Sequence, residues 1–210
     1  MTEAAAVRAP RLPREERRQQ VLAAALTVFS TSGYHAASMD EIAEEAGVSK
    51  PVLYQHFPGK LELYLELLDS GLQDLLAAAR IALASTSDNA LRGRAMVDAF
   101  LTFAVAPDSA FRLVFESDMA NEDAVRERVA VANQELERMT AEVIAEDTGL
   151  SEQEALLLAA GMQGLLQGSA RRWLRAGESR IPLEEASDLI SSLGWRGISG
   201  FPLTHPPQAE

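Results

Sequence analysis

Apolar residues recur at three- and four-residue intervals along almost the whole chain, which is the spacing of one face of an α-helix. The first such stripe consists of Leu22, Ala25, Leu26 and Phe29. We find no segment with the alternation of apolar and polar residues that marks a half-buried strand, and no internal repeat. We therefore expect an all-α protein of about nine helices. They cover roughly residues 14–31, 38–46, 49–57, 60–84, 90–106, 111–115, 125–146, 151–175 and 182–193.

Several of the expected helix ends have their own signals. Ser38 stands three residues before Glu41, which is the spacing of a capping box at a helix start, and Ser151 and Glu154 repeat that spacing. Gly33 follows the first apolar stripe and suits a helix C-terminus, because glycine readily adopts the left-handed conformation found there. These signals support separate helices over a single long one.

Composition narrows the class of protein. Hydrophobic residues make up 47% and charged residues 24% of the 210-residue chain, which is typical of a globular protein and unlike a disordered or collagen-like one. The chain has no cysteine, so disulfides and thiolate metal sites are excluded. Its longest apolar stretch, residues 155–166, is shorter than the roughly 20 residues of a membrane-spanning helix. Residues 1–20 lack the apolar core of a signal peptide, so we expect a cytoplasmic protein that does not enter a membrane.

Charge is unevenly distributed along the chain. The net charge is −12, but residues 1–60 carry seven basic and seven acidic residues and are neutral. Residues 61–210 carry 12 basic and 24 acidic residues. Both lysines, Lys50 and Lys60, lie in the neutral part. This pattern favours two units with two functions, and a random fluctuation in surface charge is the alternative.

Two short helices, 38–46 and 49–57, are joined by a tight turn at Gly47 and have the dimensions of a helix-turn-helix. Ser49 is placed to cap the second helix, and Pro51 fits its first turn. The apolar residues of the pair would face inward, namely Ile42, Ala43, Ala46, Val48, Leu53 and Phe57. Helical hairpins with a glycine turn are common, so this pattern alone leaves DNA binding and a purely structural hairpin open.

The residues of this segment resemble the DNA-binding domain of TetR/AcrR-type bacterial transcriptional regulators. The matching residues are Ser38-Met39-Asp40-Glu41-Ile42-Ala43, Ala46-Gly47-Val48-Ser49, Tyr54-Gln55-His56-Phe57 and Lys60, with Ala24, Ala25, Phe29, Gly33 and Tyr34 of the first helix. The resemblance covers about residues 14–64, and beyond it only the all-helical plan and the total length agree. It implies a DNA-binding domain at 14–60 and a C-terminal domain at 61–193 with a ligand pocket and the dimer interface. A flexible basic leader (1–13) and a tail (194–210) would flank them.

The second helix of a helix-turn-helix enters the major groove, so its first turns lie nearest the base edges. Lys50 can donate to guanine O6 and N7, and Gln55 can both donate and accept, which suits adenine. Pro51 and Val52 offer apolar contact, for instance to a thymine methyl group. Together with Ser49 at the start of the helix, these residues are expected to face the bases.

Four further residues are expected to contact phosphates. The resemblance implies that role for Tyr54, His56 and Lys60, which would fix the register of the protein on the duplex. Ser38 caps a helix whose N-terminus attracts anions. The simpler alternatives are packing for Tyr54, a local hydrogen bond for His56 and a solvated charge for Lys60.

Basic residues also gather near the N-terminus. They could form an arm that reaches phosphates or the minor groove, or a disordered leader without specific contacts. The arginines concerned are Arg8, Arg11, Arg14, Arg17 and Arg18.

The acidic C-terminal part shows no catalytic constellation. The histidines of the chain, His35, His56 and His205, form no pair with metal-ligand spacing, and no glycine-rich loop follows a strand. Gly161 and Gly164 lie within an amphipathic helix, where they suit close helix approach better than phosphate binding. We therefore expect no enzyme, no metal ion and no cofactor.

A helical bundle of this kind can instead enclose a ligand pocket, lined by apolar and aromatic side chains with a few polar groups. The residues best suited to line it are Phe100, Phe103, Phe111, Phe115, Asn133, Met162, Gln163 and Trp173, with Met119, Met139 and Gln167 as further candidates. For each of them the alternative is ordinary core packing or, for the amides, a place on the surface.

Small and branched apolar residues on the last two helices, 151–176 and 182–193, suit a four-helix bundle across a two-fold axis. They are Ala159, Ala160, Gly164, Leu165, Gly168, Leu189, Ile190 and Leu193. We therefore predict a homodimeric, DNA-binding transcriptional regulator that recognises a palindromic operator. We expect it to act as a repressor that a small, largely apolar effector releases. Activation, or response to a protein partner, are alternatives within the same fold. A helical ligand-binding protein or enzyme with a purely structural hairpin is a more remote one.

Overall fold

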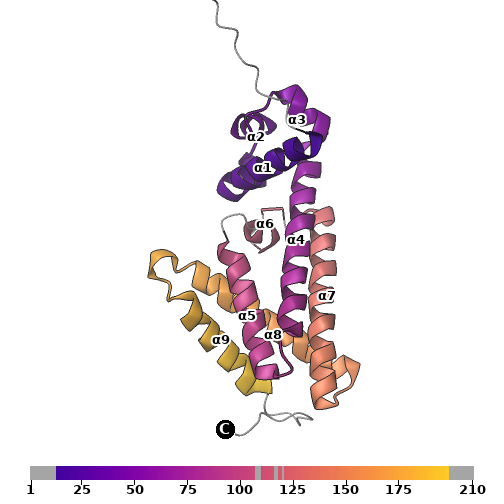
Figure 1. The fold of residues 1–210 in the computed structure, drawn as a ribbon, viewed down its shortest axis with the longest axis vertical. Helices are drawn as coiled ribbons and strands as arrows, with labels where there is room; N and C mark the ends of the chain where they lie inside the picture. The colour runs from indigo at the N-terminus through magenta and orange to yellow at the C-terminus, as the bar shows by residue number, and fades with distance from the viewer. Residues whose placement is uncertain (1–12, 107–109, 116–117, 120, 199–210) are drawn as a thin grey trace, which may run out of the picture. The chain divides into compact units, whose positions relative to one another are not determined.

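The computed structural model describes residues 13–106, 110–115, 118–119 and 121–198. Nine α-helices, α1 to α9, and one short 3₁₀ turn account for most of this part of the chain, which contains no strand (Figure 1). The predicted all-α fold of about nine helices is confirmed. The chain divides into two compact units, unit 1 up to Leu67 and unit 2 from Leu68 onward.

Unit 1 contains α1 (Arg14–Ala36), α2 (Met39–Glu45), α3 (Lys50–His56) and the first two turns of α4 (Lys60–Ala84). All four helices contribute side chains that are almost fully buried, and three aromatic rings of this core meet at centroid distances of 5.2 to 5.9 Å. The buried side chains include Val21, Ala25, Phe29, Ile42, Leu53, Phe57, Leu63 and Tyr64. Of the predicted inward-facing residues of the helical pair, all but Val48 are buried, and Val48 in the turn is half-buried.

The backbone of α1 kinks at Gly33, where φ is 77° and ψ is 169°. A side chain at such a φ would clash with the backbone, so this position favours glycine. One more turn follows, and it ends where the backbone N–H of Ala37 donates to the carbonyl of Gly33 at 3.2 Å. The expected end of the first helix near residue 31 is thus a kink after which the helix resumes.

Both predicted capping boxes are confirmed. Ser38 Oγ accepts from the backbone N–H of Glu41 at 3.1 Å, and Glu41 Oε2 accepts from the backbone N–H of Ser38 at 2.8 Å. Ser151 and Glu154 make the same pair of bonds at the start of α8, and the bonds from Ser151 lower the pKa of the Glu154 carboxyl. Ser49 occupies the N-cap position of α3, but its side chain makes no capping hydrogen bond.

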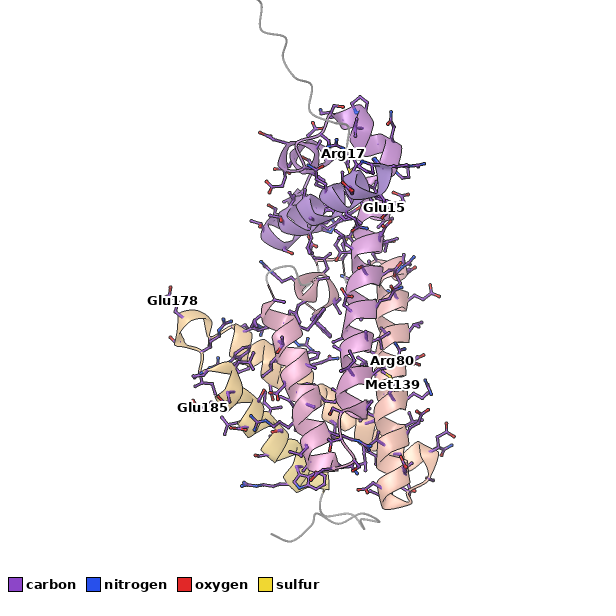
Figure 2. The ribbon with its side chains drawn as sticks, viewed as in Figure 1. Glu15, Arg17, Arg80, Met139, Glu178 and Glu185 are labelled. Atoms are coloured by element: carbon purple, nitrogen blue, oxygen red, sulfur yellow. The ribbon has the colours of Figure 1, made fainter. Side chains whose placement is uncertain are left out.

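Unit 2 contains the rest of α4, α5 (Asn89–Val105), α6 (Phe111–Phe115), α7 (Asp123–Thr148), α8 (Glu152–Leu174), the 3₁₀ turn (Gly177–Ser179) and α9 (Leu183–Ile198). α7 packs along α8, and α5 packs along α9. α4 lies beside α7 (Figure 1), and the ion pairs Asp69–Arg128 and Arg80–Glu135 link these two helices. Exposed carboxylates such as Glu178 and Glu185 project from the surface of this unit (Figure 2).

The last helix is longer than predicted. α9 continues to Ile198, so the expectation of a tail from residue 194 is wrong for residues 194–198. The tail was expected from Gly194 because the sequence from there on is rich in glycine and proline. A glycine inside a helix costs only about 1 kcal/mol, which packing can offset, and Trp195 in this added turn is half-buried.

Candidate nucleic-acid interface and ligand cavity

The helix-turn-helix is held by packing and by backbone bonds across the turn. The backbone N–H of Val48 donates to the carbonyl of Ala43 at 2.9 Å. From α1, Gln20 Nε2 donates to the carbonyl of Ala46 at 2.8 Å. Leu53 of α3 is completely buried against this framework. These bonds and the packing of Leu53 fix the position of α3 relative to α1 and α2.

The opposite face of α3 is exposed. Lys50, Pro51, Tyr54 and Gln55 lie on one side of the helix at its surface, and Val52 is half-buried at the edge. Tyr54 is 50% exposed, so its ring does not serve core packing. This face offers a cation, an amide, a phenol and apolar carbons, which are the groups that read base edges and contact phosphates.

Lys50 is paired with a carboxylate of the preceding helix. Its Nζ lies 2.5 Å from Asp40 Oδ2, and both side chains are mostly exposed. The ion pair joins the first turn of α3 to the first turn of α2, where Ser38 forms the cap. The sequence analysis gave Asp40 no role in DNA binding, because an acidic residue in the first turn of a helix is common for dipole reasons alone.

Lys60 has a different environment from the one the sequence suggested. Its Nζ donates to the carbonyls of Tyr34 and Ala37 at 2.7 and 2.8 Å and lies 4.3 Å from the centre of the Tyr34 ring. The ammonium therefore ties the end of α1 to the start of α4. His56 is half-buried, and its buried Nδ1 has no hydrogen-bond partner.

The arginines near the N-terminus divide into three groups. Arg18 forms a two-pronged ion pair with Glu66 of α4 and lies over the Phe57 ring at 4.6 Å, so it holds unit 1 together. Arg17 donates to Gln20 at 3.0 Å, and Arg14 is exposed. Arg8 and Arg11, with most of the expected leader, lie outside the described residues.

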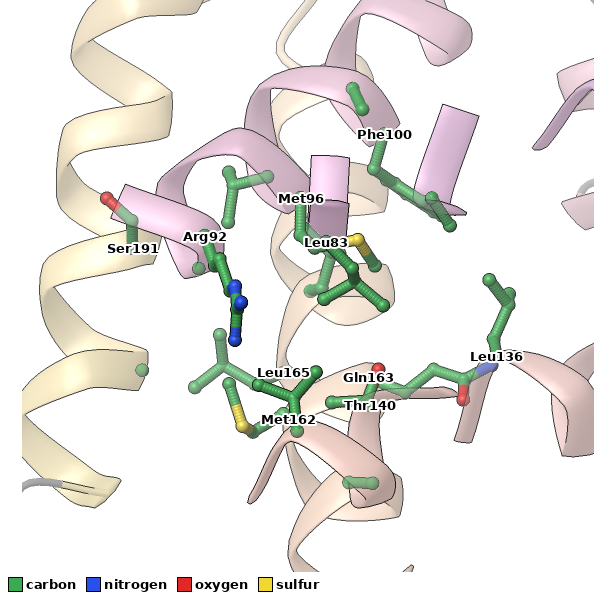
Figure 3. A pocket seen from close by; sticks show the side chains of 18 of the residues that line it. Leu83, Arg92, Met96, Phe100, Leu136, Thr140, Met162, Gln163, Leu165 and Ser191 are labelled. Carbon is green, nitrogen blue, oxygen red and sulfur yellow. The ribbon is translucent and has the colours of Figure 1, made fainter. Parts of the chain in front are cut away.

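A cavity of about 140 Å³ lies inside unit 2, walled by α4, α5, α7, α8 and α9 (Figure 3). Figure 3 shows Arg92 and Ser191 on its α5 and α9 side, and Thr140, Leu136 and Gln163 on its α7 and α8 side. Most of the lining is apolar, including Leu75, Leu83, Met96, Val97, Phe100, Ile144, Met162, Leu165, Leu166 and Ile190. A cavity with such walls suits an apolar ligand with a polar end.

Three of the predicted ligand-binding residues, Phe100, Met162 and Gln163, line this cavity, as does Gln167. The other aromatic candidates serve the core instead. The Phe111 ring lies 4.9 to 6.3 Å from the rings of Phe100, Phe103 and Phe115. Trp173, Met119 and Met139 are buried in the core as well, and Trp173 Nε1 donates to the carbonyl of Ile181 at 2.8 Å.

Asn133 belongs to a network of amides beside the cavity. Its Oδ1 accepts from Gln163 Nε2 at 2.7 Å and from Gln167 Nε2 at 3.4 Å, and Arg171 donates to Gln167 Oε1 at 3.3 Å. A guanidinium only donates, so this chain of bonds sets the orientation of each amide. It leaves Gln163 Oε1 as a buried acceptor without a partner.

Sequence reasoning missed several residues of the cavity wall, namely Asn89, Arg92, Asp147, Thr148 and Trp195. Arg92 Nη1 donates to Asn89 Oδ1 at 2.9 Å, which holds both side chains at the start of α5. Asp147 and Thr148 are buried, and they continue the inward face of α7 at the helical spacing from Thr140 and Ile144. That spacing is the signal that could have identified them, although the polar character of both residues favours a helix end instead.

A second surface of unit 2 is apolar but uncovered. Gly161, Gly164 and Gly168 lie along one exposed side of α8, and a Cβ atom at any of them would meet nothing within 4 Å. On the same helix Leu157 is 74% exposed, and on α9 Leu189 and Leu193 are 59% and 60% exposed. These glycines therefore do not serve helix packing within the chain.

None of the helices in the described ranges has the length and apolar character to cross a bilayer. Over the same residues no group of three or more acidic, histidine or cysteine side chains gathers where a metal ion could be held.

Known proteins share both the helix-turn-helix and the whole fold. Residues 21–67 match the family model described as bacterial regulatory proteins, tetR family. The HTH-type transcriptional activator FasR of Mycolicibacterium smegmatis is 44% identical over 197 residues, which are 94% of this chain and 90% of FasR. A TetR-like transcriptional regulator from Rhodococcus sp. RHA1 superposes with a TM-score of 0.74 at 32% identity, covering 90% of this chain and all of that one.

A more distant structure shares the fold at 17% identity. It is the transcriptional regulator FadR from Bacillus subtilis, solved in complex with stearoyl-CoA, with a TM-score of 0.67 over 84% of this chain and 96% of that one. The exposed face of α3, the extent of the FasR match and the match to the helix-turn-helix model agree. The chain therefore belongs to the tetR family of bacterial regulatory proteins and is a DNA-binding transcriptional regulator.

Proposed function

We propose that this regulator binds a palindromic operator as a homodimer in the cytoplasm, and that a small, largely apolar molecule in the cavity of unit 2 sets its affinity for DNA. The observation that carries the proposal is the apolar cavity of about 140 Å³. A ligand that binds only the folded form stabilises that form, so an apolar molecule that fits this cavity should raise the stability of the protein.

The dimer would form through α8 and α9. The uncovered glycines of α8 allow another helix to approach closely, and Leu157, Leu189 and Leu193 supply apolar area around them. A second copy of the chain presents the same surface, which suits a two-fold interface. Two copies of α3 would then read two half-sites about one helical turn apart, roughly 34–36 Å.

α4 offers a route from the ligand to the DNA, because this helix contributes to both units. Lys60 at its start ties down the end of α1, and Leu75 and Leu83 further along line the cavity. A ligand that binds one arrangement of α4 more tightly than another would shift the population toward one position of α3, the helix that reads the bases. The shift can be no larger than the ligand's difference in affinity between the two states.

For the sign of regulation we propose activation instead of the repression that the sequence first suggested. The support is FasR, an activator that matches almost the whole chain at 44% identity. Repression uses the same DNA-reading residues, so the two are separated by function. We expect transcription from a reporter fused to the operator to fall when the gene is deleted, and a rise on deletion would establish repression.

DNA binding and dimerisation are tested together by selecting bound sequences from a random DNA pool at physiological salt. We expect an enriched palindrome with half-sites about one turn apart. Enrichment of a single half-site would contradict the dimer. Absence of salt-sensitive binding in any pool would contradict the assignment of α3 as the helix that contacts the bases.

Ligand binding is tested by thermal unfolding with small apolar compounds that match a cavity of about 140 Å³, with stearoyl-CoA, which a protein of the same fold holds, as a larger comparison. Gly93 lines the cavity, and a Cβ atom there meets nothing within 4 Å. Gly93→Leu should therefore fill the space without a backbone clash and abolish stabilisation by the ligand, whereas Gly93→Ala should retain it. Equal stabilisation of both variants would show that the compound binds elsewhere.

A further inference from the structure

The ion pair between Asp40 and Lys50 lies at the end of α3 that is expected to approach the bases. Asp40 Oδ2 and Lys50 Nζ are 2.5 Å apart, and the two side chains are 61% and 59% exposed. A pair this exposed contributes little to stability. Because of its position, the ion pair instead affects which groups on DNA the Lys50 ammonium can reach.

The hydrogen-bonding capacity of the ammonium allows it to keep this partner on DNA. A lysine ammonium has three N–H donors, and Asp40 uses one of them. Two remain, and guanine presents two acceptors, O6 and N7, on its major-groove edge. Adenine presents one acceptor and one donor there, so it does not match the two free N–H groups.

We propose that Asp40 is a specificity-determining residue. It holds the Lys50 ammonium where its free N–H groups can donate to guanine, and it prevents the ammonium from contacting phosphates. Lysine is a flexible point charge, and without such a partner it can reach a phosphate beside any base. Phosphate contacts add affinity but carry no sequence information directly. Asp40 thus lowers affinity for unrelated DNA and raises discrimination at one position. The inference rests on α3 as the reading helix.

The test compares the wild-type protein with Asp40→Asn on the selected operator and on variants of it. The position read by Lys50 is the one whose base preference Lys50→Met weakens. At that position Asp40→Asn should reduce discrimination about fivefold or more, the lower range for one specific contact. Affinity for random DNA should rise, and the slope of log affinity against log salt should steepen by about 0.9 for each copy of the chain, the value of one added phosphate contact.

Glu44→Gln is the matched control, because Glu44 is an exposed acidic residue on the same helix. It removes the same charge without touching Lys50, so it should leave discrimination unchanged. In a Lys50→Met background, Asp40→Asn should have no further effect on discrimination. Thermal unfolding of every variant separates these effects from loss of fold.

Three results would overturn the proposal. The first is unchanged discrimination in Asp40→Asn. The second is a loss of discrimination in Glu44→Gln equal to that in Asp40→Asn, which would assign the effect to net charge. The third is a base preference that Lys50→Met nowhere weakens, which would remove Lys50 from the reading residues. In the third case a wild-type protein that still selects a palindrome would leave its function as a DNA-binding regulator intact.

Discussion

The two units of this protein are held together in different ways. In unit 1, polar links join elements that are distant in sequence, such as Arg18 to Glu66 and Lys60 to the carbonyls of Tyr34 and Ala37. In unit 2, ion pairs such as Arg94 to Asp188 also join distant elements, but there the core surrounds a cavity.

This difference fits the two tasks that we propose for the units. A reading head must present α3 in one orientation, because base contacts fail when their geometry shifts. A ligand-binding bundle must keep space and tolerate more than one packing arrangement. A firmly held α3 in unit 1 and a cavity in the core of unit 2 therefore each suit the unit in which they occur. Substitutions in the two units test whether they also differ in the free energy that each side chain contributes.

The largest difference is expected for core truncation. Ile42→Ala removes a completely buried side chain from unit 1 and should cost about 2–5 kcal/mol. Met162→Ala removes a half-buried side chain from the cavity wall of unit 2 and should cost less than about 2 kcal/mol, because less apolar surface is lost from the core. Urea denaturation, with amide hydrogen exchange to assign the loss to each unit, measures both. Equal costs would mean that unit 2 is as tightly packed as unit 1.

Glycine substitutions should act in opposite directions in the two units. Gly33→Ala forces a side chain onto a left-handed φ of 77° and should destabilise unit 1 by about 1–3 kcal/mol. Gly93→Ala lies in regular helix with open space at its Cβ and should stabilise unit 2 by about 0.5–1 kcal/mol. The free energies of unfolding of both variants test this expectation. An unchanged free energy in Gly33→Ala would show that a residue other than glycine adopts the kink without strain.

The two lysines provide a comparison within unit 1. Lys60→Met loses two charge-assisted bonds to carbonyls and should destabilise unit 1 by about 1–3 kcal/mol. Lys50→Met breaks only an exposed pair and should change stability by less than about 0.5 kcal/mol, while weakening base discrimination. Denaturation and DNA binding are measured on both variants. If Lys60→Met instead flattens the salt dependence of DNA binding at unchanged stability, Lys60 is the phosphate contact that the sequence suggested.

The smallest effect concerns the surface of unit 2. Hydrogen bonds from Arg138, with a smaller contribution from Arg80, lower the pKa of Glu135 below its ordinary value of 4.5. A lowered folded-state pKa contributes stability that is present above the ordinary value and is lost as the pH falls through the folded value. The melting temperature of wild-type protein should therefore exceed that of Glu135→Gln slightly at pH 7, and the gap should close in acid. A gap that persists in acid would assign the effect to packing.

Sequence patterns located the helices and the reading head because the relevant signals are local. Ser38 with Glu41 marks a helix start wherever it occurs, and the string around Gly47 specifies both a turn and a family. The end of α9 was misplaced because Gly194 looks the same in sequence whether or not the packing of Trp195 offsets its cost.

The candidate sites were less predictable because they depend on contacts between distant residues. Lys50 and Lys60 carry the same group, and only the fold places one beside Asp40 and the other against the carbonyl of Tyr34. Likewise Phe100 and Phe111 occupy the same kind of apolar position, yet only Phe100 lines the cavity. Periodicity identifies inward-facing residues, but it does not distinguish residues that pack in the core from residues that line the cavity.

The position of Trp195 gives the protein an optical reporter of its own. The chain has two tryptophans, and Trp195 lines the cavity while Trp173 is buried in the core, with its N–H bonded and Arg180 4.9 Å from its ring centre. Indole emission shifts with the polarity of its surroundings, so a molecule that enters the cavity would change the emission of Trp195 and leave Trp173 as a constant background. Occupancy of the cavity could thus be followed in the unlabelled protein while it is bound to its operator.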